Sequence, residues 1–142
     1  MAVRSLNPRN IDFLAVHCSD SPQGRGDDAA AIHQWHSDPR KGFDLIGYHA
    51  VILEDGQIQA GRPEYCCGAH CPKINSRSLA VCLIGDGDFT EEQLISLREW
   101  LMQRLQKYPE AKVVGHGDID PRKTCPNFDV VGWFESITEE YP

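Results

Sequence analysis

The spacing of apolar residues predicts strands and helices that alternate along the chain. Residues 11–17 (IDFLAVH) form a continuous apolar run that is typical of a strand buried on both faces, with His17 at its end. Residues 79–84 (LAVCLI) form a second run of this kind, in which Cys82 is a packing residue. Residues 112–115 (KVVG) predict a short third strand that leads directly to a histidine.

Residues 47–62 (GYHAVILEDGQIQAGR) predict a β-hairpin. Apolar and polar residues alternate on both sides of an Asp-Gly pair, and this pair is typical of a tight turn. Because side chains alternate along a strand, Tyr48 and His49 are expected to face opposite sides of the sheet. Only one of them can then face a site that contains His17, and the alternation does not decide which one.

Three segments predict helices. Asp27 is a suitable N-cap for a helix that runs through His36. Thr90 and Gln93 form a capping box at the start of a long amphipathic helix. Asp129 can cap a last helix near the C-terminus. The order of elements implies an α/β fold, with a single domain whose central mixed β-sheet is flanked by about three helices.

Composition narrows the class of protein. A chain of 142 residues suits one domain, and its net charge of −7 argues against nucleic acid as a partner. The first residues (MAVRSLNPRNIDF) have no apolar stretch of signal-peptide length, and no run approaches the roughly 20 residues of a membrane span. We therefore expect synthesis in the cytoplasm and no insertion into a membrane.

Six cysteines without an export signal favour thiols and metal ligands over a disulfide framework. Cys66, Cys67 and Cys71 lie in a long loop, residues 64–78, that is rich in Gly and Pro. They could bind a second metal ion or form a disulfide, although adjacent cysteines are geometrically poor joint ligands. Cys18 follows the first strand and is expected to be a core thiol.

Residues 115–129 (GHGDIDPRKTCPNFD) concentrate the chemistry of the chain. The proline-containing loop lets His116 and Cys125 turn back to one metal ion, with Lys123 on the same turn. His17 is the best third ligand, and three protein ligands plus one water is the arrangement of catalytic zinc. Distant His and Cys residues are often unrelated. Both histidines follow strands, so we expect the zinc site in a cleft at strand ends.

The helix near residue 30 offers another pair of histidines. His33 and His36 stand at i and i+3, a spacing compatible either with metal binding or with a role on the helix face or in capping. We favour the second interpretation.

A zinc ion held by two imidazoles and one thiolate makes hydroxide available near neutral pH and polarises carbonyl groups. A nearby cation such as Lys123 would stabilise the oxyanion of a tetrahedral intermediate, and a phenol or carboxylate would handle the proton. Together these parts describe an amide hydrolase.

Six segments in order resemble the zinc-dependent N-acetylmuramoyl-L-alanine amidases, which include the bacteriophage lysozyme-like amidases and the peptidoglycan recognition proteins. The resemblance covers about residues 11–134 of a single domain, 1–142. Its segments are VHCS, QWH, GYHAVILEDGQIQAGR, GAHCPKIN followed by Ser78, LAVCLIGD and GHGDIDPRKTCP.

The resemblance implies one Zn²⁺ ion, bound by His17, His116 and Cys125. It also implies that Tyr48 and Lys123 are the catalytic pair, with Lys123 on the oxyanion and Tyr48 positioning or deprotonating the bound water. The family positions in the substrate groove are Arg62, Gly68, His70 and Asn75.

Among the groove residues, the resemblance favours His70 as the contact to the peptide or muramyl group, with a structural loop histidine as the alternative. Two departures stand out. Ala80 occupies a position where the family usually has Gly, and the three clustered loop cysteines are unusual. The cysteines leave open a disulfide that forms in an oxidising compartment.

The implied reaction is hydrolysis of the amide bond between N-acetylmuramic acid and L-alanine in peptidoglycan. Without a signal peptide, we expect a monomeric phage or prophage endolysin that acts on the cell wall after release. The alternatives are a cytoplasmic muropeptide-recycling amidase and a non-catalytic peptidoglycan-binding module. Cys125 and Lys123 are both present, which favours the enzyme.

Overall fold

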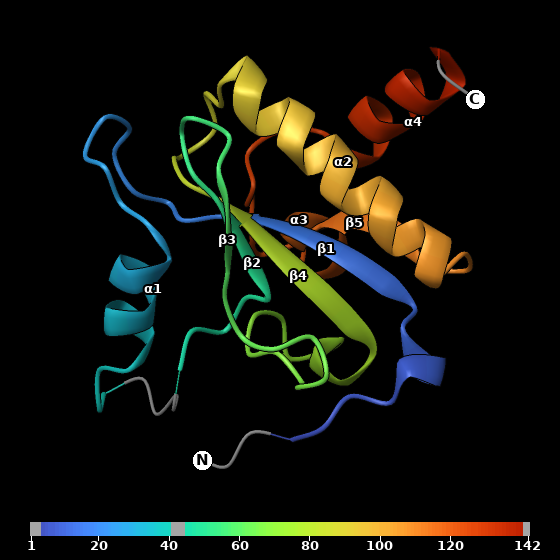
Figure 1. Ribbon diagram of the computed structural model, residues 1–142, viewed down its shortest axis with the longest axis horizontal. Coiled ribbons are helices and arrows are strands. Elements are labelled where there is room, and N and C mark those ends of the chain that lie inside the picture. Colours follow the sequence, from blue (N-terminus) through green and yellow to red (C-terminus); the bar gives the residue numbers. More distant parts are fainter. Residues whose placement is uncertain (1–3, 41–44, 141–142) are drawn as a thin grey trace.

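A five-stranded mixed sheet forms the centre of the computed structural model, which describes residues 4–40 and 45–140 (Figure 1). The strand order is β3-β2-β4-β1-β5. β4 pairs in parallel with β1 and β2, β5 pairs in parallel with β1, and β3 is the antiparallel edge strand. The strands are β1 (Phe13–Cys18), β2 (Ala50–Ile52), β3 (Ile58–Ala60), β4 (Ser78–Leu83) and β5 (Lys112–Gly115).

Three longer helices flank the sheet, and the predicted α/β architecture is confirmed. A single helical turn, α3, follows β5 in a segment that was expected to be a loop, and two short 3₁₀ helices were also not predicted. Within the described residues, no helix is both long enough and apolar enough to cross a membrane. The helices are α1 (Ala29–His36), α2 (Glu91–Lys107), α3 (His116–Ile119), α4 (Val130–Glu140), η1 (Pro8–Asn10) and η2 (Asn75–Arg77).

The two faces of the sheet are covered by different elements. α2 and α4 pack on one face, on side chains such as Leu14, Val16 and Val81 (Figure 1). On the other face, Ile32 of α1 packs with Cys82 and neighbouring residues. β4 is buried along its whole length, as its apolar sequence predicted. The side chains of β1 alternate between the two faces: Leu14 and Val16 pack under α2 and α4, whereas Ala15 packs with Cys71 and Ile74.

Helix α1 begins one residue later than predicted. Asp28, and not Asp27, is its N-cap, and the Asp28 carboxylate accepts the backbone N–H of Ala31 at 2.9 Å. The carboxylate of Asp27 is instead paired with the guanidinium of Arg25 at 2.9 Å. The prediction failed because two adjacent aspartates are equally good caps, and a local ion pair takes one of them.

The hairpin turn follows the prediction. Gly56 has a φ of 89°, a left-handed conformation that a residue without a Cβ adopts without strain. Its N–H donates to the carbonyl of Leu53 at 2.9 Å, and the Asp55 carboxylate accepts the N–H of Gln57 at 3.0 Å. The paired region is shorter than predicted, because β2 begins only at Ala50.

The predicted capping box of α2 is confirmed, and it does more than begin the helix. The Thr90 hydroxyl accepts the N–H of Gln93, and the Gln93 side chain accepts the N–H of Thr90 at 3.0 Å. The amide nitrogen of the fully buried Gln93 also donates to the carbonyls of Ile52 and Ile84, at 3.2 and 2.8 Å. One side chain therefore ties the start of α2 to the ends of β2 and β4.

We expect Gln93→Ala to lower the free energy of unfolding by about 2–3 kcal/mol, because it leaves two buried carbonyls without this donor and opens a cavity. Urea denaturation measures the change. The matched control, Gln106→Ala at an exposed position of the same helix, should stay within about 0.5 kcal/mol of the parent. Equal effects at the two positions would refute the bridging role of Gln93.

Candidate metal centre

The parallel pairing of β1 with β5 brings His17 and His116 together. Val16 lies opposite Gly115 in the ladder, so the next residue of each strand reaches the same edge of the sheet. The two imidazole centroids are 4.6 Å apart. His17 is buried at the end of β1, and His116 is the first residue of α3. The expectation that both histidines stand at carboxyl ends of strands is therefore met.

The loop after α3 carries Cys125 to the same place. The backbone N–H of Cys18 donates to the Cys125 sulfur at 3.0 Å, and the N–H of Gly117 donates to the Cys125 carbonyl at 2.9 Å. A Cβ at Gly117 would lie 2.5 Å from the Lys123 carbonyl oxygen, so the close approach of this loop requires glycine. One ligand atom from each of His17, His116 and Cys125 lies within 4.8 Å of the other two.

These three residues form the one group of three or more possible metal ligands in the part of the chain that the structure describes. The loop cysteines at 66, 67 and 71 do not join such a group there. All six cysteines of the sequence lie among the described residues, and each is a free thiol. The second metal site considered from the sequence thus gains no support.

Burial determines the protonation of the two imidazole ligands. It lowers the pKa of His17 well below the ordinary value, and the neighbouring imidazoles of His70 and His116 lower it further. Burial also lowers the pKa of His116, and the charge of Lys123 acts in the same direction. Both rings are therefore neutral at pH 7, which is the state that binds a metal ion.

The thiol of Cys125 lies beside the buried thiol of Cys18. The hydrogen bond with the Cys18 side chain is the main cause that raises the pKa of Cys125, and burial adds to it. A metal ion must displace this proton on binding. The expectation that Cys18 is a core thiol fits its burial, but its backbone N–H also donates to the Cys125 sulfur, a contact that no sequence pattern indicated.

Tyr48 packs against the metal centre. Its ring centroid lies 5.1 Å from that of His17 and 5.4 Å from that of His36. The imidazole of His49 is held elsewhere: Nδ1 accepts the N–H of Ala80 at 3.0 Å, and Nε2 bonds to the Cys66 carbonyl at 2.8 Å. The alternation of side chains along a strand does not apply to Tyr48 and His49, because β2 begins only at Ala50. The N–H of Ala80 bonds to the His49 ring instead of to a backbone carbonyl of a neighbouring strand.

The two helix histidines support the segment that leads to Tyr48. His33 Nδ1 accepts the N–H of Ile46 at 3.2 Å, and His36 Nδ1 accepts the N–H of Gly47 at 2.9 Å. Neither residue belongs to the metal-ligand group found among the described residues. The favoured interpretation of this pair, a structural role on the helix, is the one that the contacts support.

Lys123 lies on the loop between α3 and α4, two residues before Cys125. It is exposed, and its backbone N–H donates to the carbonyl of Asp120 at 2.9 Å. Because the charge of Lys123 affects the pKa of His116, the ammonium group contributes to the electrostatic field at the metal centre. The predicted ligands and the predicted cation are therefore neighbours.

Residues 7–128 match the family of N-acetylmuramoyl-L-alanine amidases. The chain belongs to this family. It is 37% identical over 134 residues to the endolysin of Escherichia phage T7, covering 89% of this chain and 87% of that protein. It is 36% identical over 144 residues to the endolysin of Enterobacteria phage T3, covering 95% and 93%. The solved structure of the N-acetylmuramoyl-L-alanine amidase LysC from Clostridium intestinale URNW superposes with a TM-score of 0.81 at 25% identity, covering 99% of this chain and 89% of LysC.

Of the groove residues expected for an amidase of this family, His70 contacts His17. The polar groups of Arg62 and Asn75 bind the protein itself. The guanidinium of Arg62 is buried and donates to the carbonyls of Leu45, Ile46 and Cys67, at distances of 3.2, 2.9 and 2.7 Å. It therefore holds the loop of residues 64–78 against the segment before β2.

Gly68, Asn75 and His70 belong to one packed unit of this amidase. A Cβ at Gly68 would lie 2.8 Å from a ring carbon of His70 and 3.0 Å from one of His49. The Asn75 side-chain oxygen accepts the N–H groups of His70 and Cys71, both at 2.9 Å. His70 Nδ1 lies 2.9 Å from His17 Nε2. These residues thus fix the surroundings of His17.

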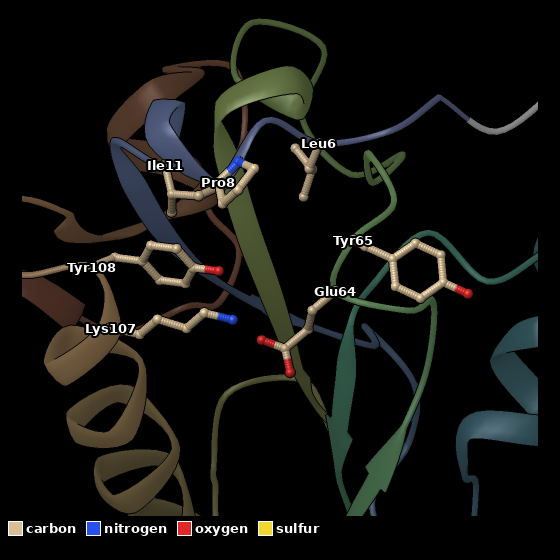
Figure 2. Close-up of a pocket in the computed structure, with 7 residues that line it drawn as sticks. All are labelled: Leu6, Pro8, Ile11, Glu64, Tyr65, Lys107 and Tyr108. Atoms are coloured by element: carbon tan, nitrogen blue, oxygen red, sulfur yellow. The ribbon is translucent and has the colours of Figure 1, made fainter.

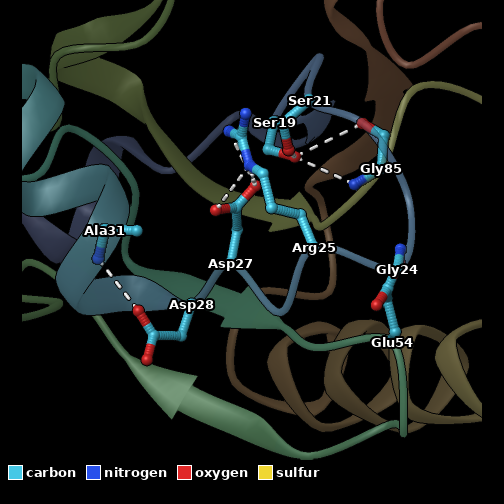
Figure 3. Close-up of polar contacts among 9 residues, drawn as sticks. All are labelled: Ser19, Ser21, Gly24, Arg25, Asp27, Asp28, Ala31, Glu54 and Gly85. Carbon is cyan, nitrogen blue, oxygen red and sulfur yellow. Dashed lines mark hydrogen bonds and ion pairs between the residues drawn. The ribbon is translucent and has the colours of Figure 1, made fainter.

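A pocket of about 460 Å³ lies along the loop that follows Cys18 in this amidase. Hydrogen bonds stiffen this loop (Figure 3): Ser19 bonds to Ser21 and to the backbone of Gly85, and Asp28 caps α1. The pocket offers hydroxyl, carboxylate, guanidinium and indole groups to a ligand. Its lining residues are Ser19, Asp20, Ser21, Pro22, Arg25, Trp35 and Asp38.

A second pocket, of about 260 Å³, lies where β1 begins, at the other end of that strand from His17. In Figure 2, Tyr65 and Glu64 lie across the opening from Lys107 and Tyr108. The Tyr65 side chain is 74% exposed. This pocket is separate from the metal centre, and it is lined by Leu6, Pro8, Ile11, Glu64, Tyr65, Lys107 and Tyr108.

We expect the metal-free amidase to lose stability as the pH falls from about 7 to about 5. Burial lowers the pKa of His49, and burial with nearby charges lowers that of His70 to about 3, against an ordinary value of 6.5. Below pH 6.5 the unfolded chain takes up protons that the folded chain does not. Stability therefore falls, by up to about 1.4 kcal/mol per pH unit for His70, and His49 contributes in the same direction.

Urea midpoints at pH 7, 6 and 5, measured in chelator, check this expectation. His49→Asn removes one of the titrating rings, so the stability of this variant should depend less on pH than that of the parent. Parallel pH profiles for the two proteins would contradict the assignment of the effect to His49.

Proposed function

We propose that the protein is a zinc-dependent N-acetylmuramoyl-L-alanine amidase that hydrolyses the bond between N-acetylmuramic acid and L-alanine in peptidoglycan. The observation that carries the proposal is the convergence of His17, His116 and Cys125, whose ligand atoms lie within 4.8 Å of one another. Membership of the amidase family and the similarity to two phage endolysins support the same reaction.

The donor set fits one zinc ion. Two neutral imidazoles and one thiolate are ligands that zinc prefers, and three protein ligands are typical of catalytic sites. A structural zinc site normally has four protein ligands, and no fourth residue joins the group among the described residues. When bound, the ion activates water and polarises the substrate carbonyl.

Two side chains act beside the metal in this proposal. Burial raises the pKa of the Tyr48 phenol well above its ordinary value, so the hydroxyl keeps its proton at neutral pH. This supports a role for Tyr48 in positioning water or substrate by hydrogen bonding, rather than in removing a proton. Lys123 keeps a positive charge next to His116, where it stabilises the oxyanion that forms on the scissile carbonyl.

The relatives suggest the biological setting. The chain covers 93% of the phage T3 endolysin and 87% of the phage T7 endolysin, so it aligns with nearly the whole of each protein. We infer that the protein is an endolysin that acts on the bacterial cell wall. The pocket along the loop that follows Cys18, with Trp35 and Arg25 in its lining, is a suitable groove for the stem peptide or the glycan.

We expect Cys125→Ser to abolish both zinc binding and amide hydrolysis, because a serine hydroxyl is a much weaker zinc ligand than a thiolate. Zinc content and the release of alanine amino groups from purified peptidoglycan are measured on the same sample. Cys66→Ser, a loop cysteine outside the ligand group, is the matched control and should keep both. A parent protein that binds zinc and peptidoglycan but releases no alanine amino groups would be a binding module, and the proposed reaction would be wrong.

We expect Lys123→Ala to keep one zinc ion and to lower kcat by about 10²–10³-fold, as the loss of one oxyanion-stabilising group usually does. Lys112→Ala, at the other end of β5, removes an equal charge away from the site and should leave kcat unchanged. The two variants are compared with the parent at saturating substrate. Retention of parental kcat in Lys123→Ala would remove the oxyanion role.

A further inference from the structure

Three hydrogen bonds in series connect His17 to the backbone carbonyl of Ile74. His17 Nε2 lies 2.9 Å from His70 Nδ1, and His70 Nε2 lies 3.0 Å from the Ser78 hydroxyl. The hydroxyl of Ser78 donates to the Ile74 carbonyl at 2.6 Å. The series therefore ends on a backbone oxygen, which can only accept a hydrogen bond.

The end of this series determines the position of every proton in it. Ser78 has one hydroxyl proton, and two oxygens 2.6 Å apart need that proton between them. Ser78 must therefore accept from His70, so the proton of His70 lies on Nε2. A neutral imidazole has one N–H, so His70 Nδ1 is an acceptor and His17 must donate from Nε2. At pH 7.5, above the ordinary histidine pKa of about 6.5, both rings are in this neutral form.

We infer that His70 is a positioning residue which, through Ser78 and the Ile74 carbonyl, fixes His17 as its Nε2–H tautomer and commits Nδ1 of His17 to the metal ion. This assignment rests on the proposed zinc site, and it gives His70 a role other than contact with the substrate. Partners of ligand histidines orient the ring and change metal affinity by about 10–100-fold.

The surroundings of His70 hold it in the orientation that this role requires. Asn75 accepts the His70 backbone N–H, and Gly68 leaves the space that the ring occupies. The rings of His17 and His70 meet edge to face at an interplanar angle of 87°, with centroids 4.9 Å apart. Ser78 is fully buried as the first residue of β4. The acceptor for His17 is therefore rigid before any ion binds.

The tautomer can be measured directly in the metal-free protein by long-range ¹H–¹⁵N NMR of the imidazole rings at pH 7.5. We expect His17 and His70 to carry the proton on Nε2. His36 and His49 are internal references, because their Nδ1 atoms accept backbone N–H groups and must be unprotonated. A proton on Nδ1 of His17 would overturn the inference, and this result does not depend on zinc binding or on hydrolysis.

Two variants of similar shape separate the effect of losing the hydrogen-bond acceptor from the effect of changing the packing. His70→Asn keeps an oxygen near the position of Nδ1, whereas His70→Leu has no acceptor. We expect His70→Leu to weaken zinc binding by about 10–100-fold in competition with a chelator, and His70→Asn to restore most of the affinity. Ser76→Ala, at an exposed site in η2, is a control with parental affinity.

Equal zinc affinities for His70→Leu and His70→Asn would overturn the positioning role. If the Leu variant does not fold, the tautomer spectrum of the parent protein still decides the question. A parent protein that binds no zinc would refute the proposed function, while a Nε2–H proton on His17 in the same sample would leave the hydrogen-bond assignment intact.

Discussion

The parallel pairing of β1 with β5 is the constraint on which the metal centre depends. Parallel neighbours end at the same edge of a sheet, so Val16 opposite Gly115 makes His17 and His116 neighbours although they are far apart in the sequence. β4 on the other side of β1 supplies Ser78 and the buried strand interior. Any change of register in this ladder would separate the two imidazoles and turn side chains to the other face of the sheet.

Backbone hydrogen bonds decide which histidines are left for chemistry. His33, His36 and His49 each accept a backbone N–H at Nδ1, so their rings serve the polypeptide. His17 and His116 have no such bond to Nδ1 among those found in the described residues, and they belong to the metal-ligand group. The polar side chains around the loop of residues 64–78 divide in the same way. Arg62 and Asn75 bind backbone groups, whereas His70 contacts His17.

Much of the fold could be predicted from local pattern. The apolar runs of β1 and β4, the Asp55-Gly56 turn and the capping box of α2 each depend on residues close in sequence, and each was predicted. The metal-ligand group could also be proposed from residue types, and family resemblance selected Tyr48. Local patterns could not distinguish Asp27 from Asp28 as a cap, because an ion pair with Arg25 decides between them.

Other parts of the site depend on contacts between distant segments. The alternation rule gave no answer for Tyr48 and His49, because it assumes a strand that in fact begins at Ala50. The N–H of Cys18 on the sulfur of Cys125 joins residues 107 positions apart. Ser78 looked like an ordinary strand residue, although it was part of the resemblance. Such roles become visible only when the tertiary hydrogen bonds are known.

The hydrogen bonds around the ligands also bear on how an ion is bound. Throughout the described part of the chain, no buried side-chain nitrogen or oxygen lacks a hydrogen-bond partner. Because an unpaired buried polar group costs about 1–3 kcal/mol, the hydrogen bond to His70 lets the fold keep His17 buried without an ion. The ligands are then already oriented, and binding requires little rearrangement. In the proposed site, two neutral imidazoles and one thiolate would leave a bound Zn²⁺ with a net charge of +1, and Lys123 would add a second positive charge. The chain has a net charge of −7, so the proposed zinc centre would be a local positive region suited to the oxyanion that amide hydrolysis generates.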